Sequence, residues 1–184
     1  MPIAGLLDRR PRGLLGAAVA VFVAAFLVAQ PGPTRAAEDG EPDFLVFGVG
    51  YFDMFKDQNA LIGNLEYRSN KTFWYLKPHV GVFGTTDGGA YIYTGVRLDI
   101  FIGNRFVISP NFSPGLYHEG GGKDLGFEVE FRSGLELGYR FDDRGRLTVA
   151  MHHLSNASLA DKNPGTETIT LYYSLPLDKL LGPE

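Results

Sequence analysis

The chain has 184 residues, a formal net charge of −4 at pH 7 and no cysteine. A mildly acidic chain of this kind does not favour nucleic-acid binding, which needs clustered Lys and Arg. Disulfides and thiolate metal sites are excluded, and the four histidines do not fall at the helical spacing of zinc ligands, so we expect neither a metal site nor a cofactor.

The first 37 residues follow the order of a cleavable export signal. Three arginines within residues 1–12 precede a nearly unbroken apolar run over 14–29, and small residues lead up to Ala37. The apolar run is shorter than the roughly 20 residues of a spanning helix, which argues against a transmembrane anchor. We therefore expect a signal peptide over 1–37 and a single domain over 38–184.

Apolar and polar residues alternate along most of the remaining chain, between short clusters of Gly, Asn, Asp and Pro. A period of two predicts strands. We expect eight of them, at residues 44–53, 60–69, 74–85, 90–102, 105–117, 124–141, 146–156 and 166–177. An even number of successive strands suits an all-β, eight-stranded antiparallel up-and-down barrel.

Two kinds of eight-stranded barrel share this pattern. In the segment 124–141, apolar side chains that include Leu125, Phe127 and Val129 are expected on one face, with charged side chains on the other. A soluble lipocalin-like barrel would turn the apolar face inward around a ligand, whereas a transmembrane barrel turns it toward lipid. Export and an aromatic content of 13% favour the transmembrane barrel, although the alternation alone does not separate the two.

The predicted connections differ in length according to the end of the barrel at which they lie. Residues 103–104 and 142–145 form short turns, whereas 118–124 and 156–166 are longer. Outer-membrane barrels have short periplasmic turns and longer external loops. The lengths therefore agree with an N-terminus in the periplasm and with the long loops at the outer surface.

Three polar residues lie on the apolar face of the last two predicted strands. His153 and Ser155 share that face in 146–156, and Glu167 shares it in 166–177, all at the outer ends of these strands. Residues two apart in a strand are separated by roughly 6.5 Å along its axis, so the His153 imidazole can lean toward the Ser155 hydroxyl. A carboxylate on the neighbouring strand can reach the other ring nitrogen. This is the nucleophile, base and orienting-acid arrangement of acyl transfer.

The stretch "HLSNASLADKNPGTE", residues 153–167, resembles the PagL-type lipid A 3-O-deacylases, an outer-membrane family of acyl hydrolases. The resemblance implies a serine esterase of the outer membrane that hydrolyses the ester-linked 3-hydroxyacyl chain at the 3-position of lipid A (lipopolysaccharide) in the outer leaflet. On the matching positions, Ser155 would be the nucleophile, His153 the base and Glu167 its orienting carboxylate. The sequence sets no oligomeric state for such an enzyme.

Residues around this motif have expected supporting roles. Asn156 and neighbouring loop amides are the candidate donors to the oxyanion, and the turn with Asn163 and Gly165 is expected to position Glu167. One feature departs from the usual pattern, because outer-membrane barrels commonly end on an aromatic residue that closes the last strand. Here the chain continues past Leu177 as "DKLLGPE".

Non-enzymatic explanations also exist for the same residues. Ser155 and Asn156 are common turn formers, His153 could be an interfacial side chain, and Glu167 could be a charge that begins the last strand. A structural or adhesive outer-membrane barrel would keep the alternation but have no use for three such residues on its lipid face. A soluble lipid-binding barrel would stay in the periplasm.

Overall fold

The computed structural model describes residues 40–55 and 58–181. The predicted signal peptide lies outside the described residues. Within the described part of the chain, no helix is long and apolar enough to cross a membrane.

The described residues form nine strands and a short C-terminal helix. In chain order these are β1 (Phe44–Phe52), β2 (Ala60–Arg68), β3 (Lys77–Thr85), β4 (Ala90–Arg97), β5 (Ile100–Ile102), β6 (Phe106–His118), β7 (Val129–Arg140), β8 (Arg146–Ser155), β9 (Thr166–Pro176) and α2 (Asp178–Leu181).

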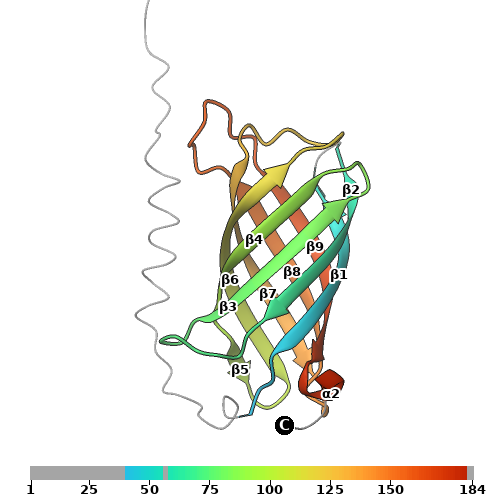
Figure 1. Cartoon of the computed structure of the whole chain (residues 1–184), viewed down its shortest axis with the longest axis vertical. Coiled ribbons are helices and arrows are strands. Elements are labelled where there is room, and N and C mark those ends of the chain that lie inside the picture. Colours follow the sequence, from blue (N-terminus) through green and yellow to red (C-terminus); the bar gives the residue numbers. More distant parts are fainter. Residues whose placement is uncertain (1–39, 56–57, 182–184) are drawn as a thin grey trace, which may run out of the picture. The chain divides into compact units, whose positions relative to one another are not determined.

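The strands close into an antiparallel barrel (Figure 1). Apart from β4 and β5, each strand pairs with its neighbours along the chain, and β1 pairs with β9 to complete the circle, with Phe44 opposite Pro176. β4 and β5 follow one another and both pair with β6, so they occupy one position in the wall. The described strands therefore fill eight positions, and the predicted eight-stranded up-and-down barrel is confirmed.

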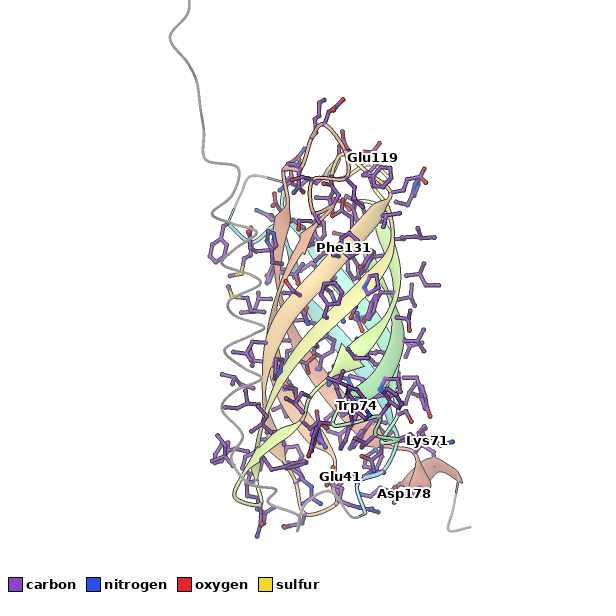
Figure 2. All side chains as sticks on the ribbon, turned by 90° about the vertical axis from the view of Figure 1, so that its left-hand side faces the viewer. Glu41, Lys71, Trp74, Glu119, Phe131 and Asp178 are labelled. Carbon is purple, nitrogen blue, oxygen red and sulfur yellow. The ribbon has the colours of Figure 1, made fainter. Side chains whose placement is uncertain are left out.

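The outer face of the barrel is apolar, whereas the interior holds buried ion pairs together with an apolar cluster that includes Phe52, Phe83 and Leu154. Val49, Leu137 and many other large apolar side chains point outward along the strands (Figure 2). Inside, buried ion pairs such as Arg68 with Glu136 and Arg146 with Asp99 link strands that are distant in the chain. Exposing the outer band to water would cost about 25 cal/mol per Å² of apolar area. The arrangement is that of a barrel surrounded by lipid, the reverse of a soluble lipid-binding barrel.

Two strands begin later than their sequence pattern predicts. The strand predicted from residue 124 begins at Val129, because Gly126 adopts a φ of 88° and interrupts the alternation. As a result Leu125 is buried at 1% exposure while Phe127 is 43% exposed, so the prediction that they share a face is wrong. The strand predicted from residue 74 begins at Lys77.

The segment that follows β9 folds back on the end of the barrel that carries the short turns. The N–H of Leu177 donates to the carbonyl of Asp43. In the short helix α2, Asp178 pairs with Arg144, and Lys179 pairs with Asp143 at 2.7 Å. The described part of the C-terminal extension thus contacts the turn between β7 and β8 and leaves the outer end of the barrel free.

Candidate active site

His153 and Glu167 meet on the outer surface of the barrel. They are direct partners in the β8–β9 register, and the Nδ1 atom of His153 lies 3.2 Å from Oε1 of Glu167. The side chains are 49% and 31% exposed, respectively, and they face the same side as the apolar band. The neighbouring His152 points into the barrel instead, where its Nε2 lies 3.9 Å from Oε1 of Glu136.

Ser155 is the last residue of β8 and lies opposite Phe131 of β7. Among the described residues, the His153 ring hydrogen-bonds to Glu167 and makes no bond to the Ser155 hydroxyl. Active-site hydrogen bonds are often long in a free enzyme and tighten when substrate binds. The orientation of the His153 ring is therefore a better guide to its partner in the reaction than the absence of a bond to Ser155 in the free enzyme.

The free edge of the His153 ring points toward the level of Ser155. In the β8–β9 register Leu154 faces Thr166, so the next pair along the two chains is Ser155 and Gly165. A Cβ atom at Gly165 would lie 3.0 Å from Cε1 and 3.5 Å from Nε2 of His153. The Cε1–Nε2 edge of the ring thus lies beside Gly165 on the neighbouring chain segment, at the level of Ser155.

A second serine lies beside the same histidine and carries no signal in the sequence. Ser133 of β7 is the direct cross-strand partner of His153 and is exposed on the lipid-facing side. It lies at the level of His153 itself, however, and the Nε2 edge of the ring is directed one step further toward the outer end. Two serines, Ser155 and Ser133, therefore flank His153 on this side of the barrel.

Asn156 organises the outer loop that follows Ser155. Its side chain is fully buried, and its amide donates to the carbonyls of Leu125 at 3.0 Å and Lys162 at 2.7 Å. Its backbone N–H donates to Oδ1 of Asn163 at 3.1 Å. An oxyanion bond from Asn156 requires one of these bonds to open, so that role stays a prediction. The role predicted for the turn with Asn163, to position Glu167, likewise stays a prediction.

A buried ion pair fixes the start of β9 to a second outer loop. The Nζ atom of Lys123 lies 2.5 Å from Oδ1 of Asp53, and the hydroxyl of Thr166 donates to the same oxygen at 2.9 Å. The N–H of Met54 donates to the carbonyl of Glu167 at 3.2 Å. Three segments that are distant in sequence therefore converge next to Glu167.

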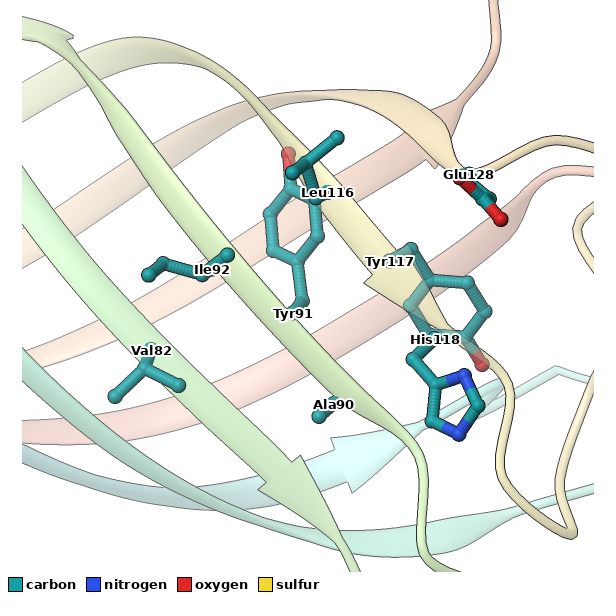
Figure 3. Close-up of a pocket in the computed structure, with 8 residues that line it drawn as sticks. All are labelled: Val82, Ala90, Tyr91, Ile92, Leu116, Tyr117, His118 and Glu128. Atoms are coloured by element: carbon teal, nitrogen blue, oxygen red, sulfur yellow. The ribbon is translucent and has the colours of Figure 1, made fainter.

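The pocket drawn in Figure 3 is lined by other strands than those that carry His153, Ser155 and Glu167. Its volume is about 340 Å³, and it is lined by residues of β3, β4 and β6, together with Glu128. None of these three strands pairs with β8 or β9. Within the described part of the chain, no three His, Asp or Glu side chains come together as a possible metal-ligand set.

Comparison with known proteins decides the family. The sequence model of the family described as lipid A 3-O-deacylase (PagL) matches residues 47–176. The chain belongs to this family. The matched region runs from β1 to the end of β9 and includes His153, Ser155 and Glu167. The protein is therefore a lipid A 3-O-deacylase, a β-barrel enzyme of the outer membrane.

Solved structures agree with the fold of a PagL-type barrel. The crystal structure of the outer membrane enzyme PagL is 20% identical in sequence, and the match covers 73% of this chain and 99% of that chain, with a TM-score of 0.60. A transmembrane β-barrel designed de novo is 14% identical, with 74% and 98% of the two chains covered and a TM-score of 0.51. A comparison with curated protein sequences gave no match.

Gly165 is expected to be required for the position of the His153 ring in this PagL-type site. The substitution Gly165→Ala would place a methyl group against Cε1 of His153 and a side chain on a backbone with φ 59°. We expect folded protein with strongly reduced deacylation of lipid A in detergent micelles. Gly103→Ala is the matched control, because Gly103 has φ 61° and open space around it. Both variants carry a left-handed backbone cost of about 1–2 kcal/mol; equal activities would contradict the proposed contact.

Removal of one partner from the buried ion pair should loosen the same site. The substitution Lys123→Met leaves the Asp53 carboxylate buried without its cation, and breaking such a pair costs about 3–5 kcal/mol. We expect a lower midpoint of denaturant-induced unfolding and lower deacylase activity. Asp178→Asn breaks an exposed pair with Arg144, for which about 0–1 kcal/mol is expected. A Lys123→Met enzyme as stable as the Asp178→Asn control would show that the pair does not hold the loops.

Proposed function

We propose that Ser155, His153 and Glu167 form the catalytic triad with which this deacylase cleaves the ester at the 3-position of lipid A. The observation that carries the proposal is the bond between His153 and Glu167 on the lipid-facing surface, at the outer end of the barrel. A triad is recognised by the geometry and roles of its members rather than by chain order. Here the carboxylate, the imidazole and the hydroxyl occupy two adjacent strands.

The location of the triad suits a substrate that never leaves the membrane. The ester bonds of lipid A lie where the sugar headgroup meets the acyl chains, which is the depth of the outer ends of the strands. A charged group on the lipid face costs only about 0–1 kcal/mol near the interface, compared with about 2–4 kcal/mol for Arg or Lys at the midplane. A site on the outer wall can therefore act on lipid A from the side, without extracting it.

In this proposal, Glu167 determines which ring nitrogen of His153 carries the proton. Its carboxylate lies at hydrogen-bond distance from Nδ1 of His153, which favours a proton on that nitrogen and leaves Nε2 as the acceptor. The carboxylate also stabilises the imidazolium that forms when His153 takes a proton. In the proposed triad, Nε2 is the nitrogen that accepts the Ser155 proton, and its position beside Gly165, at the level of Ser155, supports this role.

The reaction then proceeds in two balanced steps. Oγ of Ser155 attacks the ester carbonyl while its proton passes to Nε2 of His153. The tetrahedral intermediate collapses, the bond to the sugar oxygen breaks, and that oxygen receives the proton from His153. Water, deprotonated by the same nitrogen, attacks the acyl-serine and releases the 3-hydroxy fatty acid as the serine recovers its proton.

The oxyanion of both steps needs preorganised donors. The candidate donors lie in the turn that follows Ser155, where the N–H of Leu159 donates to the carbonyl of Asn156 at 3.0 Å and the N–H of Ser158 donates to its Oδ1 at 3.0 Å. Ala157 and Ser158, between these two residues, have φ values of 53° and 64°. We assign the oxyanion contact to Asn156 and the neighbouring amides of this turn, with one Asn156 bond opening on substrate binding.

Mass spectrometry of lipid A tests the proposed reaction. Purified enzyme in micelles is incubated with lipid A that carries all of its ester-linked chains. We expect the loss of one 3-hydroxyacyl chain from the 3-position, with the other esters intact. Lipid A of unchanged mass after incubation with folded enzyme would contradict the assignment and would favour a barrel that acts without catalysis.

A further inference from the structure

An exposed aromatic hairpin joins β2 to β3 at the end of the barrel opposite the triad. We use the name aromatic hairpin for residues 69–76. Four consecutive large side chains are exposed at its tip, with Trp74 at 81% and Phe73 at 73%, followed by Tyr75 and Leu76. Figure 1 shows this connection extending sideways from the barrel wall at the level where β3 begins. So large an apolar surface is not expected to face water.

The tip of the aromatic hairpin is an ordered turn. The backbone groups of Phe73 and Leu76 exchange two hydrogen bonds of 2.9 and 3.0 Å. The rings of Phe73 and Trp74 stack with their centroids 5.7 Å apart. Trp74 has a φ of 59°, a conformation that is costly for a bulky residue. A glycine or asparagine would suit this turn better, so the backbone does not explain why the position holds an indole.

The base of the aromatic hairpin is fixed to the barrel by Asp43. Oδ1 of Asp43 accepts the backbone N–H of Asn70 at 2.7 Å, and its other oxygen accepts the hydroxyl of Tyr67. Partial burial opposes ionisation of this carboxyl, but these hydrogen bonds hold the pKa of Asp43 below its ordinary value. The carboxylate is therefore ionised at neutral pH, and the exposed tip is held in a defined direction.

Other outward aromatic residues lie toward the same end of the barrel. Tyr139 and Tyr173 are partners of the same residue of β8, Leu147, near the inner turns of the barrel, and both are exposed. Aromatic girdles of this kind mark the membrane interfaces of outer-membrane barrels. Figure 2 shows Trp74 nearer the middle of the barrel than Lys71. The exposed Lys71 thus lies on the side of the headgroups, and the indole lies on the side of the acyl chains.

We infer that the aromatic hairpin is a membrane anchor that inserts Phe73, Trp74 and Tyr75 into the phospholipid interface of the inner leaflet, with Lys71 toward the lipid phosphates. Rings with a polar edge prefer this boundary, and a lysine can extend its charge from it to the headgroups. The hairpin continues the apolar band, which favours lipid over a partner protein as its occupant. Because the short turns lie at this end, the leaflet is the inner one.

The chain offers a direct probe, because Trp74 is its one tryptophan. The full-length protein is reconstituted into phosphatidylcholine vesicles, and indole fluorescence is compared with and without bromine atoms on the acyl chains. We expect a blue-shifted emission that is quenched more strongly by bromines near the headgroup than by bromines near the chain end. Acrylamide in the water phase should quench the emission weakly. Neither result depends on catalytic activity.

A matched variant provides the reference for lipid contact. In the double variant Trp74→Phe/Val149→Trp, the indole moves to an outward position within the apolar band, where bromines deep in the chains should quench it best. If this reference is quenched while Trp74 is not, and acrylamide quenches Trp74 strongly, the hairpin lies in water and the inference is wrong. Shielding of Trp74 from both bromine and acrylamide would identify a protein contact, such as a second copy, and would also overturn it.

Discussion

The Ser155→Ala enzyme is expected to fold normally and to leave lipid A intact. Ser155 ends β8 on the lipid-facing surface, and its side chain is only half-buried, so the loss of one hydroxyl removes little packing. Removal of the nucleophile from a serine hydrolase lowers kcat on the order of 10⁶-fold. Mass spectrometry of lipid A incubated with equal amounts of the folded variant and the native enzyme measures this loss.

Ser133→Ala is the matched control for that experiment. Ser133 is also an exposed serine on the lipid-facing side, and it is the cross-strand partner of the same histidine. We expect this variant to retain nearly native activity, because the Nε2 edge of His153 is directed past it toward the outer end. The reverse pattern, with an active Ser155→Ala and an inactive Ser133→Ala, would move the nucleophile from β8 to β7.

Substitutions of His153 and Glu167 are expected to lower the reaction rate by different factors. His153→Ala removes the base of both steps and should approach the loss seen with Ser155→Ala. Glu167→Gln keeps the shape of the side chain but no longer stabilises the imidazolium, so a smaller loss, on the order of 10⁴-fold, is expected. Initial rates of fatty-acid release at several enzyme concentrations give both values.

Controls for these two substitutions come from the other side of the barrel. His118→Ala and Glu128→Gln change an exposed histidine and an exposed carboxylate at the outer end, near the pocket of Figure 3. Both variants should retain activity. If Glu167→Gln were as active as Glu128→Gln, the bond between His153 and Glu167 would have no role in orienting the base.

The fold is predictable because a barrel wall has a strict period of two. Each inward charge in β2, such as Glu66 or Arg68, alternates with an outward apolar side chain such as Leu65. The same rule, applied to the letters of the last two strands, places His153, Ser155 and Glu167 on one face. Alternation along a strand does not depend on where the strand begins or ends. These three residues are therefore placed on one face even where the predicted bounds or the register are unknown.

Positions with unusual backbone conformations are not predictable from alternation. Gly126 turns Leu125 into the mouth of the barrel, although the letters around it continue the apolar pattern. Trp74 sits in a left-handed turn that the sequence marks with neither glycine nor asparagine, so the apolar pattern wrongly includes it in a strand. One residue with a positive φ can therefore change the face of the barrel wall on which the preceding side chains lie.

Contacts between distant segments also lie beyond what one sequence reveals. Ser133 is a neighbour of His153 only through the β7–β8 register. The contacts among Asp53, Lys123 and Thr166 join two connections and the start of β9, which share no motif or spacing. Such contacts depend on how the barrel closes and on the paths of its loops, and the sequence carries no periodic signal for either.

Covalent trapping of the nucleophile tests the central claim most directly. The folded enzyme in micelles is treated with an activated phosphonate that carries a long acyl chain, and the modified peptide is identified by mass spectrometry. The triad predicts one adduct on Ser155, formed in parallel with the loss of deacylase activity and absent from His153→Ala. Complete inactivation with the adduct on Ser133 or another residue, and none on Ser155, would contradict it.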